Sequence, residues 1–228
     1  MWGARCAGCG RACVGLCPRC RATLVRAPVV GEWTGGVLAW AGPYAGVLRA
    51  SVLAAKRRNA LGLVGVLGGL LAGALAALAL HEDAGSLTLV PVPTARAHVY
   101  QRGIDLPFEL CRIAQQRLRG AGLDVRVSAG LELARSTADQ IGLSGSARSA
   151  NMKDAFAWPG AACGSVVVVD DVVTTGATMA QAVRACHRAG VGVLGGACVA
   201  RTPVRARRGT PDPLVADVVR GGNAAHAG

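Results

Sequence analysis

The chain has 228 residues, a hydrophobic content of 52% and a formal net charge of +12. This length suits one α/β domain with a small appendage, and the apolar content is enough to bury a sizeable core. The first 20 residues carry cysteines and arginines where a secretory signal needs an apolar run, so nothing there resembles such a signal and we expect a cytoplasmic protein. The positive charge indicates anionic partners, although a general bias towards arginine explains part of it.

Two Cys-x-x-Cys pairs open the sequence, Cys6 with Cys9 and Cys17 with Cys20. Each pair can present two thiolates to one tetrahedral ion, so the spacing predicts a four-cysteine zinc knuckle over residues 1–30. Such a small unit has no hydrophobic core of its own, and structural Zn²⁺ would supply its folding free energy. A disulfide framework is the alternative, and Cys13 is a spare cysteine that could compete as a ligand.

Residues 21–44 link this knuckle to the main domain. The segment holds Trp33, Trp40 and Tyr44, and we expect these large side chains to pack the knuckle onto the domain. Residues 46–58 read as a helix that ends in a cationic cluster beginning at Lys56. Cations at a helix C-terminus are favourable on electrostatic grounds alone.

Residues 60–80 contain no charged side chain and are long enough to span a bilayer. Glycines at 65, 69 and 73 have the spacing that lets membrane helices pack closely. The segment lacks an aromatic belt, however, and the strand that follows must join the same sheet as the later valine-rich strand. The prediction is therefore a buried helix of the α/β core without stable membrane insertion, with a membrane span as the alternative.

Residues 87–92 read as a strand that runs into the turn Pro91-Val92-Pro93-Thr94. The cations Arg96 and Arg102 follow shortly after this turn. Because ligands of open α/β sheets bind outside the carboxyl ends of the strands, both the turn and the arginines are candidates for a binding site.

The rest of the chain is organised around residues 166–178. Four valines predict a strand buried on both faces, followed by Asp170 and Asp171, a loop of small hydroxyl residues and a helix from 179. The loop at a helix N-terminus suits a phosphate, and the carboxylates suit the neighbouring hydroxyls of a sugar, directly or beside Mg²⁺. This combination predicts a ribose 5-phosphate site. The alternative is a plain helix cap provided by Asp171 and Thr174.

Residues 191–200 read as one more core strand, and residues 202–228 lack apolar periodicity and are expected to be disordered. The expected fold class is α/β, with a mostly parallel sheet flanked by helices over residues 31–201.

The stretch from Val166 to Thr178 resembles the signature with which type I phosphoribosyltransferases bind phosphoribosyl pyrophosphate (PRPP). The resemblance implies that fold, and it implies that the two acids bind the ribose hydroxyls while the loop binds the 5-phosphate. It assigns PRPP binding to Asp170, Asp171, Val172, Val173, Thr174, Thr175, Gly176, Ala177 and Thr178. It adds Pro91, Val92, Pro93, Thr94 and Arg96 near the pyrophosphate.

Further motifs resemble the competence-associated ComF/GntX branch of this superfamily. They run in order through the four-cysteine knuckle, Lys56, Pro91-Val92-Pro93, Arg102-Gly103, Arg135 with Gln140-Ile141-Gly142-Leu143, Arg148 with Asn151 and Phe156, and the Asp-Asp signature. The chain departs at Asp105 and Leu106, where the branch has Asn and Gln. An aspartate there would add negative charge beside an anionic leaving group.

The resemblance implies transfer of ribose 5-phosphate from PRPP, with Mg²⁺-pyrophosphate leaving, to an acceptor that the sequence does not identify. Asp170, Asp171, Arg102 and Lys56 are the expected catalytic residues, the two cations stabilising the leaving group. The branch also implies a link to DNA uptake. The alternative function is therefore a non-catalytic accessory protein that binds a nucleotide, single-stranded DNA or DNA-uptake proteins.

Overall fold

The computed structural model describes residues 5–57, 61–134, 155–160 and 164–203. Its helices are α1 (Pro18–Ala22), α2 (Gly46–Ala55), α3 (Leu61–His81), α4 (Arg96–Arg102), α5 (Leu106–Gly120) and α7 (Ala177–Arg188). Its strands are β1 (Val29–Trp33), β2 (Gly36–Pro43), β3 (Ser86–Pro91), β4 (Asp124–Val127), β5 (Glu132–Leu133), β6 (Phe156–Ala157), β7 (Val166–Val173) and β8 (Val193–Arg201). The expected tail beyond residue 203 lies outside the described residues.

Six strands form one sheet in the order β1-β2-β8-β7-β3-β4. All neighbouring pairs are parallel except β1 and β2, which form an antiparallel hairpin at one edge. The four valines of residues 166–169 are fully buried in β7, between β8 and β3, as their run of apolar residues predicts. The strand continues through Asp170 and Asp171 to Val173, four residues further than the valine run alone suggests.

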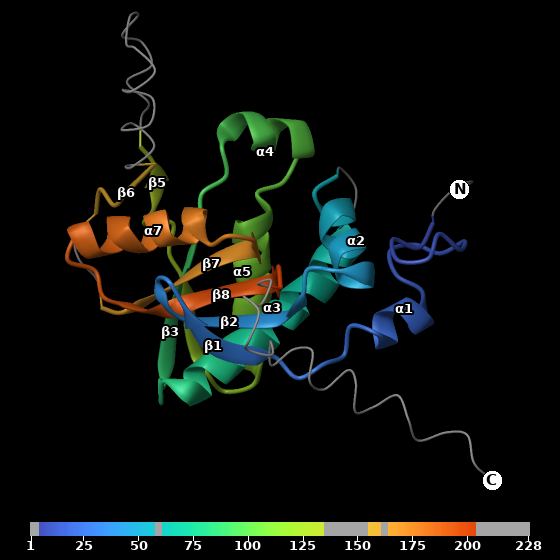
Figure 1. Ribbon diagram of the computed structural model, residues 1–228, viewed down its shortest axis with the longest axis horizontal. Helices are drawn as coiled ribbons and strands as arrows, with labels where there is room; N and C mark the ends of the chain where they lie inside the picture. The colour runs from blue at the N-terminus through green and yellow to red at the C-terminus, as the bar shows by residue number, and fades with distance from the viewer. Residues whose placement is uncertain (1–4, 58–60, 135–154, 161–163, 204–228) are drawn as a thin grey trace, which may run out of the picture.

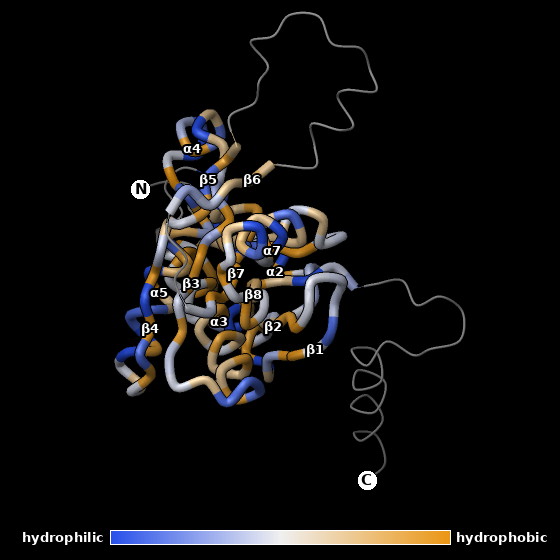
Figure 2. Tube along the Cα trace, turned by 90° about the vertical axis from the view of Figure 1, so that its left-hand side faces the viewer, coloured by the Kyte–Doolittle hydropathy of each residue, from blue (hydrophilic) through white to orange (hydrophobic). Residues whose placement is uncertain are grey.

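Helices cover both faces of this sheet (Figure 1). Residues of α2, α3 and α5 form one core cluster with one face of the strands, and α7 forms a second cluster with the other face. In Figure 2 many of the hydrophobic residues gather in the centre of the molecule, while α4, with both hydrophilic and hydrophobic residues, projects from it. The expected α/β class, a mostly parallel sheet flanked by helices, is confirmed.

Helix α3 occupies the core of the first cluster. Leu67, Leu71, Leu75 and Leu78 are fully buried, at the spacing of one helix face. The predicted core helix over residues 60–80 is therefore confirmed. It is also long and apolar enough to cross a membrane, and 56% of its most apolar 18-residue window is buried in the protein.

The glycines of α3 allow α5 to approach closely. A Cβ on Gly68 would lie 2.6 Å from Ile113 Cγ2, and one on Gly69 would lie 3.0 Å from Arg117 Cζ. Arg117 also donates a 3.4 Å hydrogen bond to the carbonyl of Gly65. The small-residue spacing thus serves contact between two helices of this domain.

The segment expected to join the knuckle to the domain is part of the sheet. Trp33-Thr34-Gly35-Gly36 turns the chain between β1 and β2, and Trp33 pairs with Gly36. Trp40 is buried within β2, where the guanidinium of Arg201 lies 4.6 Å from its ring centroid. Trp33 and Trp40 belong to the core cluster that includes α7 and contains none of residues 5–28, so the expectation that they pack the knuckle was wrong. Tyr44 packs against the other cluster, as do Ala7 and Leu16 of the knuckle.

Candidate functional site

Lys56 and Asp171 form an ion pair at the carboxyl end of the sheet. Lys56 follows the last residue of α2, and its Nζ lies 2.5 Å from Asp171 Oδ2. The Asp171 side chain is only 8% exposed, whereas that of Lys56 is 28% exposed. Apart from this ion-pair contact, the buried Oδ2 has no hydrogen-bond partner among the described residues. Two of the predicted site residues, Lys56 and Asp171, are thus brought together.

Asp170 lies on the other side of β7. Successive residues of a strand point to opposite faces, and Asp170 lines a small pocket with the loop that follows the strand. Its Oδ1 accepts a 2.8 Å hydrogen bond from the backbone N–H of Asp171. Burial, and next the charge of Asp171, raise the pKa of Asp170 to about 8. The two adjacent carboxylates therefore have different surroundings and do not share one face.

The loop after β7 brings its backbone to the start of α7. Gly176 occupies the position before the helix with φ of +79°, a left-handed conformation that glycine adopts without strain. Thr174, Thr175 and Thr178 are exposed, and Thr175 Oγ1 accepts a 3.4 Å hydrogen bond from the N–H of Ala177. The N-cap position of α7 provides no side-chain hydrogen bond. The alternative that Asp171 and Thr174 serve only as caps is therefore wrong.

Trp33 covers this loop from the edge hairpin. A Cβ on Gly176 would lie 2.9 Å from two carbons of the Trp33 ring, so a larger residue there would force the indole to move. The indole Nε1 of Trp33 is buried with no hydrogen-bond partner among the described residues. Sequence reasoning missed this residue as part of the site. The Gly-Gly pair at residues 35–36 was the available signal in the sequence, because it predicts a hairpin turn next to Trp33. It does not indicate which loop Trp33 contacts.

The turn after β3 lies beside β7. The N–H of Val92 donates a 2.8 Å hydrogen bond to the carbonyl of Val169, next to the two aspartates. Thr94 Oγ1 donates a 3.1 Å hydrogen bond to Asp105 Oδ1, which ties this turn to the start of α5. Burial raises the pKa of Asp105 above its ordinary value. Pro91 and Val92 are buried, whereas Pro93 and Thr94 are half-buried.

The remaining predicted cations lie on α4. Arg96 is exposed at its start and Arg102 is half-buried at its end, before Gly103 with φ of +73°. Neither arginine forms an ion pair with Asp170 or Asp171 among the described residues. Most residues of the two motifs that precede β7 in the resemblance fall outside the described residues, namely Arg135, Gln140, Ile141, Gly142, Leu143, Arg148 and Asn151. Phe156 is buried in β6.

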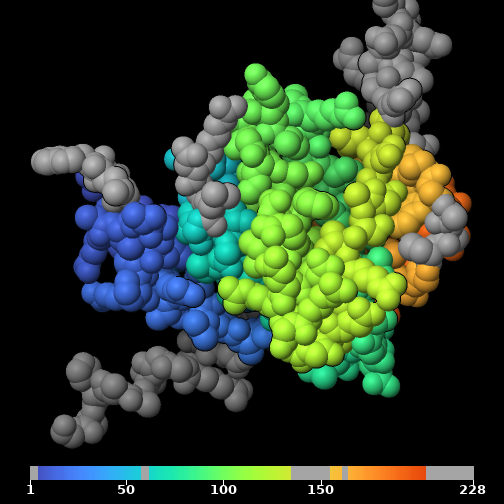
Figure 3. Space-filling view, turned by 180° about the vertical axis from the view of Figure 1, so that it is seen from behind, coloured from blue at the N-terminus to red at the C-terminus, as the bar shows by residue number. Residues whose placement is uncertain are grey.

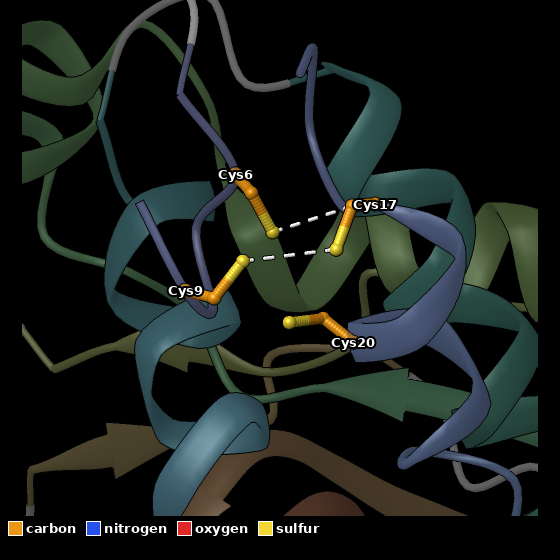
Figure 4. Close-up of side chains that lie close together, drawn as sticks. All are labelled: Cys6, Cys9, Cys17 and Cys20. Atoms are coloured by element: carbon orange, nitrogen blue, oxygen red, sulfur yellow. Dashed lines mark hydrogen bonds between the residues drawn. The ribbon is translucent and has the colours of Figure 1, made fainter. Parts of the chain in front are cut away.

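A second site gathers the four cysteines of the knuckle (Figure 4). The sulfur atoms of Cys6, Cys9, Cys17 and Cys20 all lie within 4.8 Å of one another. The Cys9 and Cys17 sulfurs are 3.7 Å apart, which matches the separation of about 3.8 Å that tetrahedral Zn–S bonds require. The backbone N–H of Cys17 donates a 3.3 Å hydrogen bond to Cys6 Sγ. The residues fit one structural zinc ion.

The protonation of these thiols is set by their surroundings. Backbone hydrogen bonds, first from Cys17, lower the pKa of Cys6 to about 6, whereas burial raises the pKa of Cys20 to about 12. The described cysteines are all free, so the disulfide alternative is wrong for this part of the chain. Cys13 stands outside the cluster and its Sγ lies 3.4 Å from the carbonyl of Val14.

A scan against models of known protein families found no match for this chain, and a search of curated proteins likewise found no matching sequence.

Proposed function

We propose that this chain is a phosphoribosyltransferase-like protein of the ComF/GntX type that binds PRPP with Mg²⁺. The observation that carries the proposal is the sequence of parts at the end of β7: two adjacent aspartates, an exposed threonine loop, and a left-handed glycine that begins an uncapped helix. The backbone N–H groups at the start of α7 and the Thr174, Thr175 and Thr178 hydroxyls suit the 5-phosphate. The carboxylates suit the ribose hydroxyls, and Mg²⁺ would take oxygen ligands there.

The proposed reaction is displacement at the anomeric carbon of the ribose. The bond from this carbon to the pyrophosphate oxygen breaks, a bond to an acceptor nitrogen forms, and that nitrogen loses its proton. Lys56 and Arg102 would stabilise the charge that develops on pyrophosphate. For this role Lys56 must be able to exchange its contact with Asp171 for one with the ligand. Its side chain is partly exposed, so rotation of the side chain alone can make this exchange.

The charge of Asp105 affects how favourably the site binds pyrophosphate. It replaces the Asn of the related motif, and a full negative charge would oppose the leaving group. The hydrogen bond that Thr94 Oγ1 donates to Asp105 Oδ1 disperses part of this negative charge. We therefore retain enzymatic transfer as the leading function, with the acceptor unassigned.

Calorimetric titration with PRPP, with and without Mg²⁺, tests the proposal. Binding should require Mg²⁺ and should disappear in the Asp170→Asn/Asp171→Asn variant while circular dichroism stays unchanged. A folded, zinc-loaded protein that does not bind PRPP contradicts the proposal. Positive binding leads to a screen of nitrogen acceptors, with release of pyrophosphate as the signal.

A second function, binding of single-stranded DNA as an accessory of DNA uptake, is favoured by the surface of the knuckle. Five arginines are exposed on or just after it: Arg5, Arg11, Arg19, Arg21 and Arg26. Binding through such cations weakens steeply as salt rises. Fluorescence anisotropy with a labelled oligonucleotide at several salt concentrations separates this function from PRPP binding, which depends on Asp170 and Asp171. Cytoplasmic location remains a prediction for both functions.

A further inference from the structure

The knuckle packs directly against the first turn of α2. Gly8 lies within the first Cys-x-x-Cys pair, and a Cβ there would lie 2.8 Å from Cys20 Sγ and 3.0 Å from Val47 Cγ1. The backbone of the knuckle therefore contacts a side chain of α2 with no space for a methyl group. Figures 1 and 3 both show the knuckle beside α2.

No side-chain cap holds the start of α2. Its N-cap residue, Ala45, provides no side-chain hydrogen bond, and Gly46 has φ of +49°. A pocket of about 250 Å³ also lies there, between the knuckle segment at Thr23 and Leu24 and the first turn of the helix. The contacts of Val47 with the knuckle, and of Leu48 with the core, therefore do much to position this end of α2.

At the other end of α2, Lys56 forms the ion pair with Asp171. From Val47 to Lys56 the helix rises by about 14 Å. Within it Ser51 Oγ donates a 2.7 Å hydrogen bond to the carbonyl of Val47, and Val52 and Ala55 are buried against the core. The N–H of Lys56 donates to the carbonyl of Val52, which fixes the direction in which its side chain leaves the helix. A displacement of the first turn is thus transmitted along a short rigid segment to the Lys56–Asp171 pair.

We propose that the zinc knuckle is a positioning element for the site at the end of β7, acting through α2 on Lys56. In this arrangement the metal-bound knuckle holds the start of α2, and α2 holds Lys56 against Asp171. The statement about α2 stands on its own contacts, while its consequence for PRPP affinity rests on the proposed function. Loss of the metal then changes ligand binding without any cysteine touching the ligand.

The test compares the zinc-loaded and zinc-free protein in three forms: unmodified, Lys56→Met and Arg57→Met. Arg57 is the matched control, because it is an exposed cation at the same helix end. Zinc removal should weaken Mg²⁺-PRPP binding about ten-fold in the unmodified protein and in Arg57→Met. In Lys56→Met the same removal should change binding by less than about two-fold, since the coupling is already lost. Equal weakening in all three forms overturns the proposal.

Hydrogen exchange measured by mass spectrometry gives a readout that needs no ligand. Zinc removal should speed exchange in residues 46–57, and unchanged exchange there overturns the proposal whether or not PRPP binds. If no form binds PRPP, the proposed function fails while this measurement still decides the coupling. If the zinc-free chain unfolds, the zinc-loaded Val47→Ala variant is compared with the zinc-loaded unmodified protein instead. Faster hydrogen exchange at residues 52–57 with zinc retained supports the proposal, and unchanged exchange overturns it.

Discussion

The ring of Trp33 lies 2.9 Å from the position that a Cβ on Gly176 would occupy. A residue of the edge hairpin thus limits which side chain can stand immediately before α7, although the two residues are far apart in the sequence. The backbone imposes the same choice independently, because Gly176 has a φ of +79°. Two separate physical reasons require glycine at this position.

Gly176→Ala is therefore expected to destabilise the protein by about 2–4 kcal/mol, the sum of left-handed strain and a clash with the indole. Gly190→Ala is the matched control. Gly190 has a φ of +72° but no atom within 4 Å of its Cβ position, so only about 1 kcal/mol should be lost. Urea unfolding of both variants measures the difference. Equal losses would show that the Trp33 contact has no energetic weight.

Removing one partner of the Lys56–Asp171 pair should cost more than removing both. Lys56→Met leaves a nearly buried carboxylate without its cation and should cost about 2 kcal/mol of unfolding free energy. The double variant Lys56→Met/Asp171→Asn removes the charge as well and should recover part of that loss. Thermal and urea unfolding of the two single variants and the double variant provide the cycle. Additive losses would contradict a coupled pair.

Asp170 should make both stability and ligand binding depend on pH. Because the folded pKa of about 8 lies above that of an unfolded aspartate, the folded state holds the extra proton between about pH 4 and 8. Stability from this group is complete below about pH 4 and is lost as pH rises through about 8. Asp170→Asn should remove this part of the pH dependence. Melting temperatures of both proteins across pH 4–9 make the comparison.

Binding of Mg²⁺ at Asp170 requires the ionised carboxylate. At pH 7 the ligand should therefore displace a proton, and affinity should increase with pH up to about 8 and then level off. Calorimetry in buffers with different ionisation enthalpies measures the released proton. Binding without proton release at pH 7 would place the metal elsewhere.

Each of the four clustered cysteines should be needed for zinc, and Cys13 should not. Substitution of Cys6 by serine should abolish binding of one zinc ion per chain and lower the melting temperature, because the knuckle lacks a core of its own. Cys13→Ser should retain one zinc ion. Metal content by atomic absorption distinguishes the two. Loss of zinc in Cys13→Ser would make Cys13 a ligand.

Substitutions at Leu71 and Leu80 test whether α3 is a core helix of the folded domain. Leu71 is fully buried, so Leu71→Ala should cost about 3 kcal/mol through lost contacts and the cavity left behind. Leu80 is 85% exposed, and Leu80→Ala should change stability by less than about 0.5 kcal/mol. Unfolding of the purified protein in aqueous buffer measures both. Similar small effects would mean that α3 does not form the core of a folded domain in water.

The sequence predicts best where one local pattern has one structural solution. Four valines before two aspartates identify a buried strand with a candidate site at its end, and paired Cys-x-x-Cys motifs identify a metal cluster. It predicts less well where distant segments decide the outcome. Nothing local to Trp33 indicates Gly176 as its neighbour, and nothing local to Asp170 and Asp171 indicates that only the second meets a lysine.

The position of β2 determines when this sheet can be completed. β2 lies beside β8, with Leu38 paired to Gly196, so an early strand hydrogen-bonds with the last one. During synthesis the knuckle can form from local contacts, while the β2 edge with Leu38, Ala39 and Trp40 has no partner until Arg201 has emerged. An apolar strand edge that stays open for most of translation invites association between nascent chains. Chains interrupted before β8 should aggregate, even though they contain the whole metal cluster and all of the described helices.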